Sequence, residues 1–331
     1  QSRLFEEIRQ CREAGQRVLL LVPEQFSHET ERRLCAAGGD AISLHAEVLT
    51  FSRLASRVFA ERGGVAETET DGGGKLLMMA LAVEQVRSRL KIFGASAARA
   101  EFLLQLLDML EEFRSFCVTA DQLRRAAAGL TGTLAVKTEE FALLMESYDA
   151  VCAQIGQNPQ SRLTRLLNAL EDCDDLSDRE FWIDGFTDFN GVERNILAQL
   201  LNGGAGLTVA LLCDGLHGHA QQYAAARETA AALCAIAAQQ QIPVETRQLP
   251  PREETSALAR LRAGLFGGAM HPWDAPQDAV AFLSSGGRTE ECRTVAGEIL
   301  KLVEQGARWR DIAVACTDYA AYRPMLESIL K

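Results

Sequence analysis

The chain alternates short apolar runs with amphipathic segments near its beginning and again after its middle. The runs have the length and density of strands buried on both faces, and the segments between them repeat with helical period. We predict strands at 18–22, 41–44, 47–49, 181–183, 207–212 and 244–247, and helices at 2–14, 28–36, 50–61, 190–200 and 221–239. Because strands that alternate with helices form parallel sheets, the sequence predicts an α/β fold.

The middle of the chain has a different pattern, in which almost every apolar residue follows helical period. We predict helices at 76–90, 97–116, 120–128, 138–155 and 162–170. Thr119 and Gln122 have the spacing of a capping box at the start of the third of these helices. We therefore expect an all-helical insertion domain at 72–175, which interrupts a first α/β domain made of residues 1–70 and 176–270.

A looser connection at 250–276, which contains Gly267, Gly268, Pro272 and Pro276, marks a domain boundary. After it, apolar runs at 279–283 and 312–315 flank a helical pattern at 289–304. The pattern predicts the start of a second α/β domain at 277–331. Since the chain stops inside this unit, we expect it to be a fragment.

The stretch from 180 to 193 joins a predicted strand to a predicted helix through polar residues. Asp184 follows the buried run at once, and Asn190 with Glu193 gives the N-cap and N3 pattern of a helix start. Ligands of open α/β sheets bind beyond the carboxyl ends of the strands. Asp184 is therefore a candidate contact for a metal ion or a nucleotide, and its alternative role is to cap a turn.

Composition narrows the class of protein. The 331 residues are 47% hydrophobic and 24% charged, as in ordinary globular proteins. No apolar run approaches the length of a membrane span, and Gln1 begins no signal peptide, so we expect a cytoplasmic protein without membrane contact. The net charge of −11 argues against a polycation-like nucleic-acid binder but allows a narrow basic groove. The nine scattered cysteines indicate reduced core thiols rather than a metal cluster.

Two further motifs lack the residue spacing that a phosphate loop or a zinc site requires. Gly72-Gly73-Gly74-Lys75 lacks the earlier glycine and the following Ser or Thr of a phosphate loop, and no strand precedes it, so we predict a plain loop. His217 and His219, with His271 farther on, lack further ligands at zinc-site spacing, and we expect surface histidines.

Four pieces of the chain, in order, resemble the AddB (RexB) subunit of the AddAB helicase–nuclease. They are LLLVPEQF at 19–26, VLTFSRLA at 48–55, IDGFTDF at 183–189 followed by Glu193, and RDIAV at 310–314. More distantly, the layout is similar to UvrD-type superfamily 1 helicases, whose first motor domain also carries a helical insertion. The resemblance implies a P-loop-NTPase-like (helicase motor) domain with a parallel sheet.

The resemblance also assigns roles to single residues. Gln25 and Phe26 lie where such helicases place a loop that touches single-stranded DNA, and Thr50, Phe51, Ser52 and Arg53 lie where a second such loop does. Two groups of basic residues and the aromatic rings of Phe26 and Phe51 are compatible with DNA contact. The basic residues are Arg53, Arg57, Arg62, Arg87, Arg89 and Lys91. The alternative is that both rings are buried and the arginines are solvated.

Asp184 matches the magnesium-holding aspartate of the Walker B motif, and Gly185 replaces the neighbouring glutamate that orients the attacking water. The family's phosphate loop would lie before Ser2, and its nuclease domain and iron–sulfur cysteines would lie beyond Lys331. ATP and magnesium therefore stay open as cofactors without support inside this chain, and we expect an iron–sulfur cluster only in a C-terminal region.

By this resemblance the chain is a degenerate helicase scaffold that binds single-stranded DNA, pairs with an AddA-type subunit, and serves double-strand-break repair, recombination and scanning for a hotspot sequence. Two alternatives stay open. One is an active ATPase motor whose phosphate loop precedes Gln1, and the other is an assembly scaffold that binds no DNA.

Overall fold

A computed structural model describes residues 2–13, 17–62, 70–97, 99–171, 176–249, 256–265 and 276–330. The chain divides into two compact units, Gln1–Leu249 and Pro250–Lys331, and each is described by itself. None of the helices in the described part is long and apolar enough to cross a membrane.

The first unit contains the predicted parallel sheet, so the α/β fold is confirmed. Its four strands are β1 (Val18–Leu21), β2 (Ala46–Leu49), β3 (Glu180–Ile183) and β4 (Gly206–Val209), arranged in the order β2-β1-β3-β4. All three neighbouring pairs are parallel, and Leu21 lies in register with both Leu49 and Ile183. The ends of these strands therefore meet along one edge, which we call the carboxyl edge.

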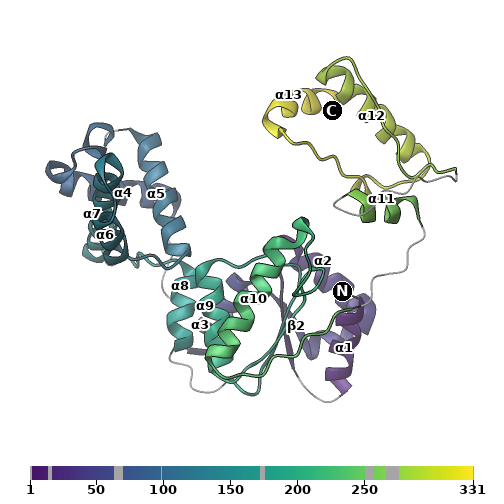
Figure 1. The fold of residues 1–331 in the computed structure, drawn as a ribbon, viewed down its shortest axis with the longest axis horizontal. Coiled ribbons are helices and arrows are strands. Elements are labelled where there is room, and N and C mark those ends of the chain that lie inside the picture. The colour runs from purple at the N-terminus through teal and green to yellow at the C-terminus, as the bar shows by residue number, and fades with distance from the viewer. Residues whose placement is uncertain are drawn as a thin grey trace. The chain divides into compact units, whose positions relative to one another are not determined.

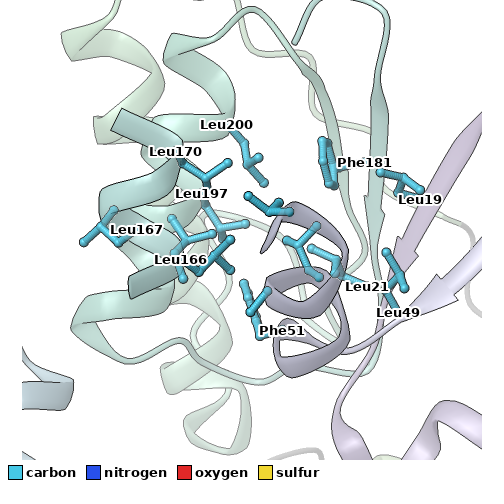
Figure 2. Packing of buried hydrophobic residues seen from close by; sticks show 14 of the residues in the cluster. Leu19, Leu21, Leu49, Phe51, Leu166, Leu167, Leu170, Phe181, Leu197 and Leu200 are labelled. Carbon is cyan, nitrogen blue, oxygen red and sulfur yellow. The ribbon is translucent and has the colours of Figure 1, made fainter. Parts of the chain in front are cut away.

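Helices cover both faces of the sheet, which explains the unbroken apolar runs of the strands. Leu20 and Trp182 face α1 (Ser2–Glu13) and α2 (Ser27–Gly38). Leu21 and Phe181 face the opposite way, where they pack with α3 (Phe51–Arg62), α8 (Arg162–Glu171) and α9 (Gly191–Asn202). Figure 1 shows these helices on the two sides of the sheet, with α10 (Ala224–Gln239) beside α9. Figure 2 shows the side chains of the second face meeting in one cluster.

The helices of the middle segment have a core of their own. They are α4 (Gly72–Val86), α5 (Ala100–Ser115), α6 (Ala120–Ala128) and α7 (Gly132–Gln154), and residues such as Met79, Leu110 and Leu144 are fully buried among them. The predicted insertion domain also included α8, but Leu166 and Leu170 of that helix pack in the core of the sheet. Hydrophobic periodicity predicts that a segment is helical but not which core it packs in. The sequence pattern therefore could not show that α8 packs on the sheet rather than in the insertion domain.

Several predicted elements differ from the structure. The predicted strand at 41–44 is a 3-10 helix, Asp40–Leu44, and the predicted strand at 207–212 ends at Val209. The predicted strand at 244–247 is irregular. The glycines at 72–74 open α4 rather than form a loop, because the Asp71 carboxylate accepts a hydrogen bond from the Gly74 N–H and caps the helix.

The second unit contains α11 (Ala257–Leu265), α12 (Arg288–Glu304) and α13 (Tyr319–Ile329). Contrary to the prediction, the apolar segments at 279–283 and 312–315 are not strands, and residues 276–330 contain no strand. A strand requires hydrogen bonds to a neighbouring strand, and neither segment pairs with another in the described residues. Phe282, in the first segment, is 92% exposed.

Candidate functional site

Three loops leave the carboxyl edge of the sheet side by side. The Val22 N–H donates to the Leu49 carbonyl at 2.9 Å, and the Asp184 N–H donates to the Leu21 carbonyl at 3.0 Å. These two bonds continue the hydrogen bonding of the β1–β2 and β1–β3 pairs by one residue beyond the ends of the strands. The loops that begin at Pro23, Thr50 and Asp184 therefore start next to one another, with the Pro23 loop in the middle.

The Pro23 loop carries the most exposed aromatic ring of the carboxyl edge. Pro23 is followed by a 3-10 turn, Glu24–Phe26, which is closed by a hydrogen bond of 2.9 Å from the Phe26 N–H to the Pro23 carbonyl. Gln25 is exposed, and Phe26 is 43% exposed. A ring held in a short turn and half open to solvent can stack on a planar ligand at little entropic cost.

Gly185 brings the Asp184 loop against the Pro23 loop. Its φ of +83° lies in the left-handed region that glycine adopts without strain. A Cβ placed on it would lie 3.3 Å from Pro23 Cδ and 3.5 Å from Phe26 Cδ2. Two of the sequence-predicted positions, Phe26 and Gly185, thus lie next to each other, although 159 positions of sequence separate them.

Thr50 and Phe51 do not form the contact surface that was predicted for them. Thr50 is 1% exposed, and its hydroxyl oxygen accepts a hydrogen bond of 3.2 Å from the Arg53 N–H at the start of α3. Phe51 is 5% exposed and packs edge-on against Phe186 and Phe189, with ring centroids 5.7 and 6.4 Å away. Because the core of the sheet covers Phe51, its ring is not available to a ligand.

Ser52 and Arg53 are exposed in the first turn of α3. The Arg53 guanidinium donates at 2.6 Å to Glu31 of α2, and the two side chains are 50% and 37% exposed. Exposed ion pairs of this kind contribute about 0–1 kcal/mol, so a ligand phosphate can compete with Glu31 for the guanidinium. Arg57, one turn later, is instead held by Glu47 and Glu61.

Asp184 is half-buried, and its Oδ2 atom is buried without a hydrogen-bond partner. A free carboxylate oxygen of this kind fits a magnesium ligand, because Mg²⁺ in nucleotide sites takes one or two carboxylates together with phosphate and water. The described residues contain no group of three His, Cys, Asp or Glu side chains that could hold a metal ion by themselves. Asp184 would therefore serve as one ligand among ligands from elsewhere.

The helix that follows the Asp184 loop begins as predicted. Asn190 and Glu193 form a full capping box, with both hydrogen bonds at 2.9 Å. Burial raises the pKa of the Glu193 carboxyl above its ordinary value, and the charge of Asp188 adds to the shift, while the Asn190 N–H opposes it.

Sequence reasoning missed the residue that ties this loop to α10. Thr229, 4% exposed, donates its hydroxyl to the Thr187 carbonyl at 3.1 Å. A threonine in an alanine-rich helix is the only sign of it in the sequence.

The histidines and cysteines that the structure describes form no metal site of three ligands. His217 and His219 are exposed, as expected of surface histidines, and His271 lies outside the described residues. Cys173 lies outside them too. The eight described cysteines are free thiols, of which only Cys152 and Cys292 are fully buried, so the expected core location holds for few of them.

A family model and several curated proteins that are similar to this chain all point to the same family. A family model described as ADDB, N-terminal, matches residues 1–262. A curated protein from Desulforudis audaxviator, named as the B subunit of an ATP-dependent helicase/deoxyribonuclease, is 32% identical over 98% of this chain and 29% of its own length. Proteins of the same name from Geobacillus thermodenitrificans and Pelotomaculum thermopropionicum are 30% and 31% identical, over 98% and 96% of this chain and 30% and 29% of their own lengths. The chain thus spans less than a third of these relatives.

Proposed function

The chain belongs to the AddB N-terminal family, and from that membership we propose that it is the DNA-facing, helicase-like part of the B subunit of a helicase/deoxyribonuclease. In this role it binds single-stranded DNA across the carboxyl edge of the sheet and does not hydrolyse ATP itself. Its partner is a second subunit of the AddA type, and the complex processes double-strand breaks for repair and recombination.

The observation that carries the proposal is the meeting of exposed groups from adjacent strands at the carboxyl edge. Gln25 and Phe26 follow β1, and Ser52 and Arg53 follow β2, its parallel neighbour. The salt bridge between Arg53 and Glu31 joins α3 to α2, the helix that follows Phe26. A strand of nucleic acid that crosses this edge would meet both loops in succession.

The chemistry of these groups suits a single strand better than a duplex. A half-exposed ring such as Phe26 stacks on an unpaired base, whose face a duplex would hide. Gln25 and Ser52 offer polar contacts to phosphates, and Arg53 offers a cation. The N-termini of α2 and α3 begin beside these residues, and helix N-termini favour phosphate groups.

The overall charge sets the expected strength of binding. A net charge of −11 repels DNA at long range, and Glu31 must release Arg53 before a phosphate can replace it. We therefore expect modest affinity that falls steeply with salt.

The test is a titration of labelled oligothymidylate with the chain at several salt concentrations, followed by fluorescence anisotropy. Phe26→Ala should weaken binding by about 1–3 kcal/mol, the cost of one lost stacked base. The control is Phe116→Ala, which removes a ring that is 55% exposed at the end of α5. This control should bind like the wild type.

Arg53→Ala should lower the salt slope by about 0.7, the value for one phosphate contact of a single strand. Its control is Arg293→Ala, which breaks a comparable exposed pair with Glu290 in the second unit. If the wild type binds no DNA at low salt, or if Phe26→Ala and Arg53→Ala both bind like their controls, the proposal fails and an assembly scaffold without DNA contact replaces it.

A further inference from the structure

Gly185 has two constraints that act together. Its backbone has a φ of +83°, which L side chains rarely adopt, and its α-carbon faces the rings of Pro23 and Phe26. The nearest approach of an added Cβ would be 3.3 Å to Pro23 Cδ, which is tighter than ordinary van der Waals contact. Any side chain at this position would therefore require the Pro23 ring to shift by a few tenths of an ångström.

The backbone of Phe26 is held between the turn that precedes it and α2, which begins at the next residue. The ring is 43% exposed, so a large part of it has no protein neighbour. Its backbone is held by the turn bond to Pro23, and Pro23 itself rests on Gly185. A shift of Pro23 would be transmitted through this turn to Phe26.

We propose that Gly185 is a positioning residue for Phe26: the absence of a side chain at 185 lets the Pro23 loop seat against the Asp184 loop and presents the Phe26 ring to a base of single-stranded DNA. The inference rests on the proposed DNA binding. It gives Gly185 a function of its own, beyond the replacement of a carboxylate. It also implies that a larger residue at 185 costs DNA binding even where it could restore a polar group.

Gly204 supplies a matched control. Its φ is +86°, so an alanine there meets the same backbone strain as at 185. Its nearest neighbour would be Ser177 Cβ at 3.5 Å, an ordinary contact. Gly204 also lies just before β4, at the edge of the sheet opposite to Phe26. The two glycines therefore differ in what a new side chain would displace.

The experiment measures the affinity of the whole chain for labelled oligothymidylate in Gly185→Ala, Gly204→Ala, Phe26→Ala and the double variant Gly185→Ala/Phe26→Ala. We expect Gly185→Ala to weaken binding about fivefold, the lower end of the range for one stacked aromatic, and Gly204→Ala to leave it unchanged. Because Gly185 acts through Phe26, the double variant should bind no more weakly than Phe26→Ala alone.

Gly185→Asn keeps the inference testable if the alanine variant unfolds, because asparagine tolerates a positive φ better than other side chains. It should weaken binding at least as much as alanine, while Gly204→Asn should not. The inference would be overturned by wild-type affinity in both Gly185→Ala and Gly185→Asn, or by fully additive losses in the double variant. If Phe26→Ala still weakened binding, the proposed DNA contact of Phe26 would stand in either case. Wild-type affinity in Phe26→Ala would instead refute the stacking contact on which the inference rests.

Discussion

Glu140, in α7, is a buried carboxylate that holds the chain after α4 in place. It is 4% exposed, and its two oxygens accept hydrogen bonds from three successive backbone N–H groups, those of Lys91, Ile92 and Phe93, at 2.5–3.2 Å. The carboxylate thereby satisfies three backbone donors of a part-buried segment.

Glu140→Gln should destabilise the chain, because an amide offers one acceptor oxygen where the carboxylate offers two. The expected loss is about 1.5–3 kcal/mol, the contribution of a hydrogen bond to a charged group. Urea denaturation followed by circular dichroism measures it. Glu139→Gln, at the exposed neighbouring position, should change stability little, and equal effects of the two substitutions would contradict this assignment.

Glu193 should make stability depend on pH. Its folded pKa lies above the ordinary 4.5, so between these two values the folded chain binds a proton that the unfolded chain has released. The contribution of this group to stability therefore increases as the pH falls through the raised pKa, and it decreases as the pH rises.

Glu193→Gln should remove this dependence, because glutamine keeps the capping-box acceptor without a charge. Unfolding free energies of both proteins, measured from about pH 4 to pH 7, should show the variant gaining relative to the wild type as the pH rises above 4.5. A constant difference across this range would show that the carboxyl does not titrate as described.

Single residues also show what local sequence can and cannot predict. The capping boxes at Thr119 and Asn190 were predicted correctly, because all of their partners lie within three residues. Phe26 and Phe51 each lie at the start of the helix that follows one of two neighbouring strands, yet only Phe26 is exposed. The difference arises from Phe186 and Phe189, which cover Phe51 from a distant part of the sequence.

At the scale of elements, α9 meets the connection between α5 and α6. A Cβ on Gly191, the first residue of α9, would lie 2.8 Å from the Phe116 Cα and 2.9 Å from its carbonyl carbon. The Asn195 side chain also donates to the Cys117 sulfur at 3.3 Å. Glycine at 191 therefore allows the α5–α6 connection to approach the helix that follows the Asp184 loop.

Gly191→Ala should force this contact apart, since the clash is with backbone that cannot rotate away. Overpacking of this kind costs about 1–3 kcal/mol, and amide exchange near Phe116 should accelerate. Gly129→Ala, whose new Cβ would meet only the Ala126 carbonyl at 3.6 Å, is the control. Unchanged exchange at Phe116 in the Gly191 variant would argue against the contact.

The hydrophobic pattern predicted some of these elements correctly and others not. The parallel sheet could be predicted because its strands are apolar on both sides and alternate with helices. The segments at 279–283 and 312–315 have the same apolar character, but a strand forms only with a partner, and composition does not show whether one is present. The packing of α8 on the sheet was missed for a similar reason, because the apolar face of a helix does not show which element will pack against it.

At the scale of the whole molecule, we expect no ATP hydrolysis by the 331-residue chain. Phosphoryl transfer requires a positioned water and groups that neutralise phosphate charge. Gly185 has no side chain to orient water, and the sequence contains no phosphate loop with its lysine. Steady-state phosphate release should stay at background in the presence of Mg²⁺ and DNA. Turnover that Asp184→Ala abolishes would contradict this expectation.

Binding of single-stranded DNA at the carboxyl edge is tested most directly by mapping where DNA lies on the molecule. Oligothymidylate that carries 5-iodouracil is irradiated with the chain, and cross-linked peptides are identified by mass spectrometry. We expect adducts in the segment that contains Gln25 and Phe26, and we expect them to disappear in Phe26→Ala. Adducts confined to other parts, such as α4–α7, or no adducts at low salt, would show that single-stranded DNA does not bind at the carboxyl edge.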